Sequence, residues 1–301
     1  MGIDGIFNLS KPCGKTSFDI VAAVRRISGE RRVGHAGTLD PAATGVLPIC
    51  LGQGTRIIEF LMDTRKTYQA EIELGTVTDT YDAEGRIINQ RDASHITKEQ
   101  LLEVLPRFRG PISQLPPMYS AVKQQGRPLY ELARAGKEVV RTPRTVELFR
   151  LELLEWHPRT FTVEVECSKG TYIRSLAYDI GEALGSGAYL KGLARLKSGP
   201  FCLDDALTLE DLELAFQYDY WDKLIYPLDF PLLSWRAAIV GEESEYALRN
   251  GRPLPLGQDG SVRCRAYGAN GQMIAILRFV AEKGLWHPEK VFPQISEQTA
   301  A

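Results

Sequence analysis

The alternation of apolar and polar residues over residues 66–74 is the feature that most constrains how this chain folds. Side chains of an extended strand point alternately to its two faces, so one face of this segment is apolar and the other is polar. The apolar face carries Tyr68, Ala70, Ile72 and Leu74. The pattern predicts a strand that is half-buried in a sheet.

Two further strand-like runs, 146–154 and 161–167, follow each other with a short connection between them. The segment 75–88 is rich in turn residues and predicts a long loop or hairpin after the first strand. Strands joined in this way, without strict alternation with helices, favour an antiparallel arrangement. We therefore expect an α+β fold with a mainly antiparallel mixed sheet that is flanked by helices.

Helix starts are recognisable from threonine residues in capping positions ahead of apolar stripes. Four such starts are present, at Thr16, Thr97, Thr171 and Thr208. The first helix is expected to end at Gly29, because glycine is favoured just past the last helical turn.

Length and a change of pattern predict two domains. A chain of 301 residues exceeds the usual size of one domain. Prolines cluster over residues 227–235, and short strand-like runs alternate with Gly and Asn turns beyond them. We place a large domain at 1–230 and a small β-rich domain at 231–301.

Composition narrows the class of protein. No apolar run approaches the length that crosses a bilayer, and the N-terminus lacks the pattern of a signal peptide, so we expect a cytoplasmic protein. The five cysteines are scattered and contain no CxxC pair, which argues against a disulfide framework and against structural zinc. The four histidines never form an HxxxH pair, so we predict no metal site.

Charge is unevenly distributed although the formal net charge is only −2. Residues 105–150 contain nine Lys or Arg against three Asp or Glu, and 167–201 contain five against two. Residues 202–250 reverse the balance, with eleven acids against three bases. This distribution permits a basic face for nucleic acid, but on charge alone an ordinary solvated surface is the favoured interpretation.

One motif is a decoy. The letters GKT at 14–16 resemble the end of a phosphate-binding P-loop, but the position of that motif's first glycine holds Leu9. We interpret this segment as a turn followed by a helix cap.

The stretch GHAGTLDPAATG, residues 34–45, places the single acid Asp40 among small residues. Pro41 restricts its own backbone and biases Asp40 towards an extended conformation, while the neighbouring alanines leave space above the carboxylate. A rigid acid with room over it suits a nucleophile or a general base. A turn or helix-cap residue is the alternative, because Asp before Pro is common there.

The same stretch resembles the catalytic motif of the TruB family of tRNA pseudouridine synthases, which act on uridine-55 in the T-loop of tRNA. The similarity extends over most of residues 5–205 in the family's order, through KPCGKTS, GHAGTLDPAATGVLPICLGQGTR, KTYQAEIELGTVTDTYDAEG, PPMYSAVKQQGRPLYELARAG and CSKGTYIRSLAYDIGEALGSGAYLKGLARLKSGPF. The resemblance implies a pseudouridine synthase fold and, more weakly, a PUA-like RNA-binding domain at the C-terminus.

The resemblance also implies roles for individual residues. Asp40 is the nucleophile, Tyr68 stacks on the target base, and Arg174 pairs with the nucleophile. Tyr172 and Leu193 line the pocket. His35 belongs to the region that fills the space vacated when the base is flipped out of the tRNA loop.

The implied reaction breaks the N1–C1′ bond of uridine, turns the base and joins its C5 to the sugar. It involves no redox change and no phosphate transfer, so we expect no cofactor. The carboxylate can attack either C6 of the base or C1′ of the sugar, and the sequence does not decide between these two routes. The hydroxyl of Tyr68 is a candidate for removing the proton from C5.

The expected partner is the T-arm of tRNA, with no membrane, no metal and no second subunit. Six basic residues are predicted to contact its phosphates: Lys123, Arg127, Arg134, Arg141, Lys191 and Arg195. A tRNA-binding or folding factor without catalysis is the alternative function. A glycoside hydrolase is disfavoured, because that chemistry uses two carboxylates and none stands beside Asp40 in the motif.

Overall fold

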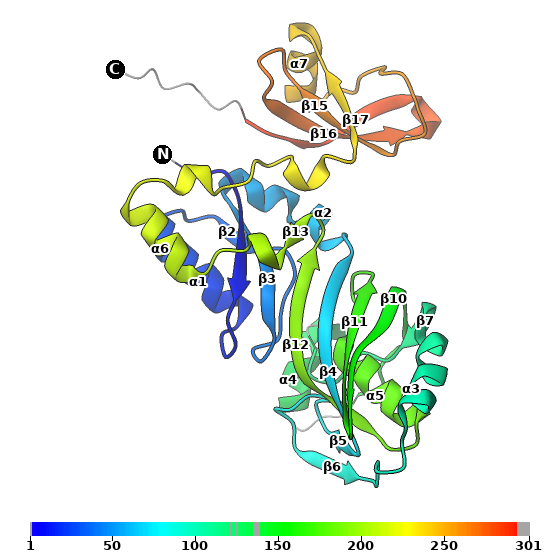
Figure 1. The fold of residues 1–301 in the computed structure, drawn as a ribbon. Coiled ribbons are helices and arrows are strands. Elements are labelled where there is room, and N and C mark those ends of the chain that lie inside the picture. Colours follow the sequence, from blue (N-terminus) through cyan, green and yellow to red (C-terminus); the bar gives the residue numbers. More distant parts are fainter. Residues whose placement is uncertain (1, 121, 125, 135–138, 294–301) are drawn as a thin grey trace.

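The computed structural model describes residues 2–120, 122–124, 126–134 and 139–293 (Figure 1). Its strands are β1 Gly5–Lys11, β2 Val33–His35, β3 Thr44–Leu51, β4 Lys66–Leu74, β5 Thr76–Thr78, β6 Ile87–Gln90, β7 Gly110–Gln114, β8 Lys123–Gln124, β9 Arg127–Pro128, β10 Arg144–His157, β11 Thr160–Cys167, β12 Ala188–Ser198, β13 Phe201–Cys202, β14 Arg236–Ile239, β15 Arg263–Tyr267, β16 Met273–Val280 and β17 Leu285–Val291. Its α-helices are α1 Ser17–Ser28, α2 Ile58–Met62, α3 Lys98–Val104, α4 Leu129–Arg134, α5 Ile173–Ala183, α6 Leu209–Gln217 and α7 Glu242–Arg249.

One large sheet organises most of the chain, in the order β1-β3-β12-β4-β11-β10-β7, with β2 paired to β3 and β13 paired to β12. Every neighbouring pair along this order is antiparallel except β3 and β12, which run parallel. Helices α1 and α6 lie beside the β1 end of the sheet, and α3 and α5 lie towards the β7 end (Figure 1). The predicted α+β fold with a mainly antiparallel mixed sheet is confirmed.

The parallel contact between β3 and β12 divides the sheet into two halves. Only two residue pairs join these strands, Ala194 with Thr44 and Arg195 with Gly45. Gly45 has φ of +100°, and a Cβ built on it would lie 2.3 Å from the carbonyl oxygen of Arg195. Glycine is therefore required where the two halves approach each other, and the strands diverge on either side of this short contact.

Local sequence signals set most element boundaries. Strand β4 has the expected alternation, and Ala70, Ile72 and Leu74 enter a core with residues of β10, β11 and α5. Capping boxes at Thr16 and Thr97 start α1 and α3, and Gly29 ends α1 in the left-handed conformation.

Two further predictions concern helix starts. Thr208 caps α6 as expected, with its side chain accepting from the backbone N–H of Asp211. The predicted cap at Thr171 is wrong, because the N-cap of α5 is Tyr172. The Thr171 hydroxyl instead donates to the carbonyl oxygen of Ser168 at 3.0 Å, within the preceding turn.

The C-terminal part forms a separate small β domain of four strands in the order β14-β15-β16-β17, with α7 packed on it (Figure 1). It has its own core around Trp286, which is fully buried. Phe292 and Ile276 of this domain also share an apolar cluster with Phe60 of α2. The small domain is therefore packed directly against the large one.

Candidate active site

A cavity of about 760 Å³ opens near the junction of the two half-sheets. Its walls come from the loop before β3, from β4 and β12, from the connection between β5 and β6, and from the start of α5. Five of the six residues predicted to act on or bind the substrate line it: Asp40, Tyr68, Tyr172, Arg174 and Leu193. The fold therefore brings together residues that are widely separated in the sequence.

The loop that carries Asp40 is held by its backbone. The carbonyl oxygen of Asp40 accepts from the N–H of Ala43 at 3.1 Å, which closes a turn with Pro41 in its second position. The hydroxyl of Ser17 donates to the carbonyl oxygen of Leu39 at 3.2 Å and accepts from the N–H of Leu39 at 2.9 Å. The residues on both sides of the carboxylate are thus fixed.

The segment that mimics a P-loop supports this same turn. The fully buried Lys11 donates from Nζ to the carbonyl oxygens of Pro12, Lys15 and Pro41 at 2.6–3.0 Å. The N–H of Gly14 also donates to the carbonyl oxygen of Pro41, at 2.9 Å. Burial lowers the pKa of Lys11, and nearby acidic groups, among them Asp40, oppose that effect.

Arg174 joins two carboxylates. Its Nε lies 3.0 Å from Oδ2 of Asp40, and its Nη2 lies 3.3 Å from Oδ1 of the same group. Its Nη1 lies 3.1 Å from Oδ2 of Asp82, and Nη2 also donates to the carbonyl oxygen of Tyr119 at 2.9 Å. The side chain of Arg174 is only 7% exposed, so this bidentate grip on Asp40 operates in a poorly solvated place.

Asp82 lines the cavity and pairs with Arg174, and sequence analysis missed it. It comes from the turn-rich segment between β5 and β6, and its side chain is 14% exposed. Its other oxygen, Oδ1, accepts from the hydroxyl of Thr80 at 2.5 Å and from the N–H of Glu84 at 3.1 Å. The signal available in the sequence was the acid-rich turn TDTYDAEG, which gives no indication of a partner in α5.

The electrostatic environment of Asp40 is a balance of opposing effects. The pKa of its carboxyl group is raised overall, because burial, with a smaller contribution from Asp82, outweighs the lowering by Arg174 and Lys11. The side chain is 41% exposed, and that exposure is to the cavity. A ligand that fills the cavity removes this remaining solvent, so the guanidinium of Arg174 becomes the main factor that keeps the carboxylate ionised.

One wall of the cavity is made by two paired strands. Tyr68 of β4 lies opposite Arg195 of β12, and Ala70 lies opposite Leu193. Residues two apart on a strand share a face, so Tyr68, Leu193 and Arg195 present their side chains on the same side. Burial raises the pKa of the Tyr68 hydroxyl, whereas Arg195, which is hydrogen-bonded to it, lowers that pKa.

Tyr172 is positioned through its backbone. Gln114, at the end of β7, accepts from the N–H of Tyr172 at 2.7 Å and donates to its carbonyl oxygen at 3.0 Å. Gln114 is 1% exposed, so the start of α5 is clamped from inside the core. Burial raises the pKa of the Tyr172 hydroxyl, which keeps it a neutral polar group at the cavity wall.

His35 lies apart from these five residues. It ends β2 and is not among the residues that line the cavity, although Gly37, two residues later, is. Burial and the charge of Arg195 lower the pKa of His35, so its ring is neutral at physiological pH. Within the described part of the chain, its buried Nδ1 has no hydrogen-bond partner. Its predicted role during base flipping stays a prediction.

The prediction that Arg195 contacts RNA phosphates is corrected by the structure. Its side chain is 1% exposed, and it donates from Nε to the carbonyl oxygen of Val46 at 2.6 Å and from Nη2 to that of Gly37 at 3.0 Å. Arg195 thus ties the segment before Asp40 to β3 from beneath the cavity. It is a buried structural cation, not a surface contact for a nucleic-acid backbone.

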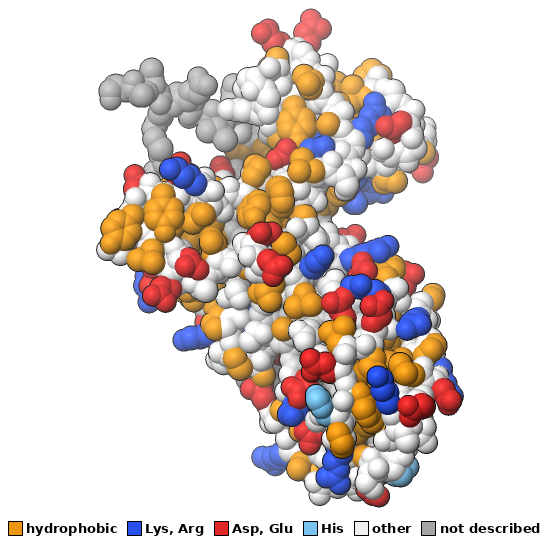
Figure 2. Space-filling model, viewed as in Figure 1, with side chains coloured by type: hydrophobic (Ala, Val, Ile, Leu, Met, Phe, Trp, Pro, Cys, Tyr) orange, Lys and Arg blue, Asp and Glu red, His pale blue; other side chains and the backbone are white. Residues whose placement is uncertain are grey.

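The other basic residues predicted to contact RNA stay predictions. Lys191 pairs with Glu71 at 2.8 Å, and Arg127 lies 3.9 Å from Glu131. Arg141 donates to the carbonyl oxygen of Pro116 at 2.9 Å. The two remaining residues are placed in β8 and α4: Lys123 and Arg134. Basic and acidic side chains are interspersed over the face seen in Figure 2.

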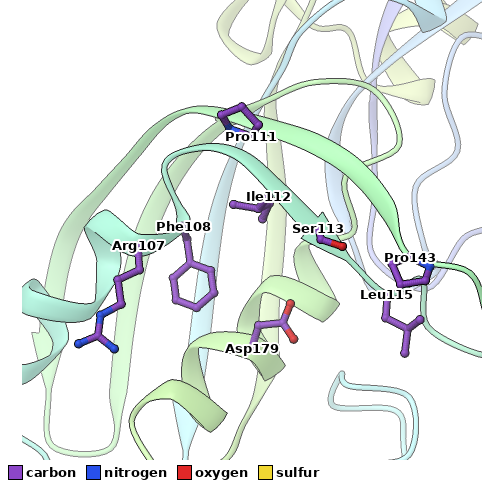
Figure 3. A pocket seen from close by; sticks show the side chains of 8 residues that line it. All are labelled: Arg107, Phe108, Pro111, Ile112, Ser113, Leu115, Pro143 and Asp179. Carbon is purple, nitrogen blue, oxygen red and sulfur yellow. The ribbon is translucent and has the colours of Figure 1, made fainter.

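A second, smaller cavity of about 560 Å³ lies further along α5 (Figure 3). Its lining is polar and apolar in about equal parts and includes Phe108, Ile112 and Leu115 together with the carboxyl group of Asp179 (Figure 3). Burial and the neighbouring charge of Glu182 raise the pKa of Asp179 to about 6. The charged neighbour that shifts the pKa of Asp179 is the acid Glu182, whereas Asp40 pairs with Arg174.

Neither a metal cluster nor a membrane span is found in the part of the chain that the structure describes. No group of three or more His, Cys, Asp or Glu side chains there is placed to hold a metal ion. None of the described helices combines the length and the apolar character that crossing a membrane demands.

The main cavity can support a definite kind of chemistry. It combines a fixed carboxylate, a buried guanidinium that favours its ionised form, and an aromatic ring on an adjoining wall. Such a set can bind a flat, uncharged ring and attack an electrophilic carbon next to it.

Comparison with known proteins gives a consistent result. Residues 25–173 match the model of the TruB family pseudouridylate synthase N-terminal domain, and residues 174–233 match that of the tRNA pseudouridylate synthase B C-terminal domain. The chain is 46% identical to tRNA pseudouridine synthase B of Dehalococcoides mccartyi over 96% of its length and 97% of the relative. It is 44% identical to the protein of the same name from Pseudomonas putida, with 89% of both chains covered.

Solved structures agree with the fold. The chain matches a protein in the crystal structure of a Cbf5-Nop10-Gar1 complex with a TM-score of 0.75 and 28% identity, over 96% of this chain and 85% of the other. It also matches a chain in the structure of an H/ACA RNP bound to a substrate RNA containing 2′-deoxyuridine, with a TM-score of 0.73 and 26% identity, at the same coverage.

Proposed function

Because this chain belongs to the TruB family of pseudouridylate synthases, we propose that it is an isomerase that converts uridine-55 in the T-loop of tRNA to pseudouridine. The observation that carries the proposal is the carboxylate of Asp40, gripped by Arg174 in a cavity whose wall presents the ring of Tyr68. A protein that only binds tRNA needs no such fixed, partly buried acid. This argues against the binding-factor alternative.

The proposed reaction conserves all atoms of the nucleotide. The N1–C1′ bond breaks, a C5–C1′ bond forms, the proton on C5 leaves, and N1 gains a proton. Asp40, with both oxygens held by Arg174, attacks C1′ or C6 as an ionised nucleophile, and the bond that it forms breaks again before the product leaves, so the carboxylate is regenerated. Because the overall change is an isomerisation, no external oxidant, reductant or group donor is required.

The cavity walls are suited to an extruded base. Taking a base out of its stack costs a few kcal/mol, and stacking on an aromatic ring returns about 1–3 kcal/mol. Tyr68 supplies such a ring, and Leu193 supplies an apolar neighbour on the same wall. Since burial raises the pKa of the Tyr68 hydroxyl, that group is protonated at neutral pH and accepts the C5 proton only after giving up its own.

Contacts to the rest of the tRNA are assigned to exposed cations around the cavity. Arg144 lines the cavity with an exposed side chain, and Lys169, also in the lining, pairs with Asp63 at 2.6 Å. Arg144 is therefore assigned a contact to a phosphate group at this rim. Binding of tRNA is then expected to weaken steeply with added salt, and a salt-independent Kd would contradict this assignment.

The small domain is proposed to be a PUA-like extension of the RNA-binding surface. Its docking supports a fixed rather than a tethered arrangement, since Lys290 pairs with Glu59 of α2 at 2.6 Å and Arg56 donates to the carbonyl oxygen of Val291 at 2.5 Å. We assign the protein to the cytoplasm, where it acts on tRNA as a monomer.

The function is tested with an unmodified tRNA transcript. After incubation with the protein, carbodiimide treatment and primer extension are expected to reveal one new stop, immediately 3′ of the modified base, that reports pseudouridine at position 55. A transcript with cytidine at that position is the matched control and is expected to show no stop. Absence of modification in the uridine transcript would overturn the proposed activity, and modification only at another uridine would overturn the assigned position.

A further inference from the structure

The connection between β5 and β6 contains a backbone conformation that is rarely adopted. Tyr81 has φ of +63°, in the left-handed region that disfavours residues with a side chain. In the described residues, only Arg159 and Asp219 share this feature among non-glycines. Tyr81 is the one whose neighbour, Asp82, lines the catalytic cavity. Such conformations persist where the surroundings impose them, and they concentrate at functional sites.

Two contacts hold Tyr81 from outside the connection. Its carbonyl oxygen accepts from the N–H of Leu190 on β12 at 2.9 Å. Its ring stacks on the ring of Tyr178 in α5, with centroids 4.2 Å apart and planes inclined by 23°. The connection is therefore attached to the sheet through its backbone and to the helix through an aromatic pair.

The contacts to α5 form a matched set. Tyr178 follows Arg174 by four residues, so the two side chains lie one turn apart on the same side of the helix. Tyr81 contacts Tyr178, and the next residue, Asp82, contacts Arg174. Two consecutive loop residues thus meet two consecutive turns of the helix.

The connection behaves as one compact body. Thr80 and Glu84 bind Oδ1 of Asp82, and the hydroxyl of Thr78 donates to the carbonyl oxygen of Asp82 at 2.7 Å. Gly85 is packed so tightly that a Cβ there would lie 2.2 Å from the hydroxyl oxygen of Thr80. These hydrogen bonds tie Asp82 to the rest of the connection, so the docking of the connection sets where its Oδ2 meets Arg174.

We propose that the stacked pair Tyr81–Tyr178 is a positioning device for catalysis, which docks the β5–β6 connection so that Asp82 holds Arg174 in the orientation that grips Asp40. The proposal rests on the isomerase function proposed above. The two tyrosines touch neither substrate nor reacting atoms in this scheme. They act through Asp82 and Arg174.

The test is the single-turnover rate of pseudouridine formation, measured together with the Kd for tRNA. Tyr81→Ala and Tyr178→Ala are each expected to slow the reaction by about 10- to 100-fold, as expected for a small misplacement of catalytic groups, and to change Kd by less than about twofold. Tyr81→Phe and Tyr178→Phe keep the stacked ring and are expected to remain within about twofold of the wild-type rate. The double Ala variant is expected to be no slower than the slower single variant.

A matched control removes an aromatic stack elsewhere. Trp221 stacks on Phe216 with centroids 5.4 Å apart and planes inclined by 6°, in a core that does not line the cavity. Trp221→Ala is expected to lower the Tm while leaving the single-turnover rate unchanged. If Tyr81→Ala does not fold, Tyr178→Ala carries the test, because alanine favours the helix.

The possible failures are distinct. If the wild-type protein forms no pseudouridine, the proposed function fails. If the wild-type protein is active and both Tyr→Ala variants keep its rate, the positioning role is overturned. It is also overturned if the Phe variants are as slow as the Ala variants, since the ring stack is then not what matters.

Discussion

The two cavities beside α5 each contain a partly buried carboxyl group, but the charges that surround this group differ between them. Burial raises the pKa of both Asp40 and Asp179. Asp40 faces the guanidinium of Arg174 at 3.0 Å, which opposes that shift. At Asp179 the negative charge of Glu182 adds to the effect of burial, and together they raise the pKa to about 6.

The comparison shows that burial alone does not make a catalytic acid. A desolvated carboxyl group with no cation takes up a proton more readily and loses its nucleophilic form. The same desolvation becomes useful when a fixed cation retains the charge, because the carboxylate is then ionised and poorly hydrated. At Asp40 the fixed cation is in place, and a ligand that fills the cavity completes the desolvation.

The largest effect is expected from Asp40→Asn, which removes the carboxylate from the main cavity. The amide keeps the size of the side chain but cannot act as the nucleophile, so single-turnover pseudouridine formation is expected to fall by at least about 10⁴-fold. Filter binding is expected to give a tRNA Kd close to that of the wild type. Conversion at a normal rate would show that Asp40 does not carry the chemistry.

Arg174→Lys tests the geometry of the cation while keeping its charge. An ammonium group cannot hold both oxygens of Asp40 and also reach Asp82, so the single-turnover rate is expected to fall by about 10²–10³-fold. Circular dichroism checks that the variant keeps the secondary structure content of the wild type. A wild-type rate in a folded variant would remove the proposed role of the bidentate grip.

Two variants of Tyr68 test whether its ring stacks on the target base or only fills the core. Tyr68→Phe keeps the ring and is expected to preserve tRNA capture, whereas Tyr68→Ala is expected to weaken productive binding by about 5- to 150-fold, equivalent to about 1–3 kcal/mol. The measurement is the tRNA concentration dependence of the single-turnover rate. Equal behaviour of the two variants would indicate that Tyr68 only fills the core.

Asp179→Asn tests the effect of burial on the carboxyl group of the second cavity. Because the folded-state pKa is raised to about 6, the native protein binds this proton more tightly than the unfolded chain, and its stability falls as pH rises from about 4 to about 6. The variant avoids that loss and is expected to be more stable at pH 7 by about 1–2 kcal/mol, with a smaller difference at pH 4. Thermal melts at the two pH values measure this, and an unchanged Tm difference would contradict the argument.

Much of the fold could be predicted because its signals are local. The alternation in residues 66–74 corresponds to β4, and the capping boxes at Thr16, Thr97 and Thr208 start helices. The cap at Thr171 could not be predicted correctly, because the start of α5 is fixed by the distant Gln114.

The candidate site was predictable only in part. The family motifs indicated residues that the structure places around one cavity, but Asp82 was missed, because its partner Arg174 is far away in the sequence. The burial of Arg195 could have been predicted from the sequence. It lies two residues after Leu193 on the same strand, so both share the inward face. The support of the Asp40 loop by Lys11 has no periodic signature, since it uses backbone carbonyl groups.

The pH dependence of the single-turnover rate, compared between the wild type and Arg174→Gln, tests the central claim most directly. Since Arg174 lowers the pKa of Asp40 against the effect of burial, removing its charge raises that pKa, and more alkaline solution is needed to ionise the nucleophile. We predict that the acidic limb of the rate profile moves to higher pH in the variant. An acidic limb at the same or a lower pH would contradict the claim that Arg174 keeps Asp40 ionised.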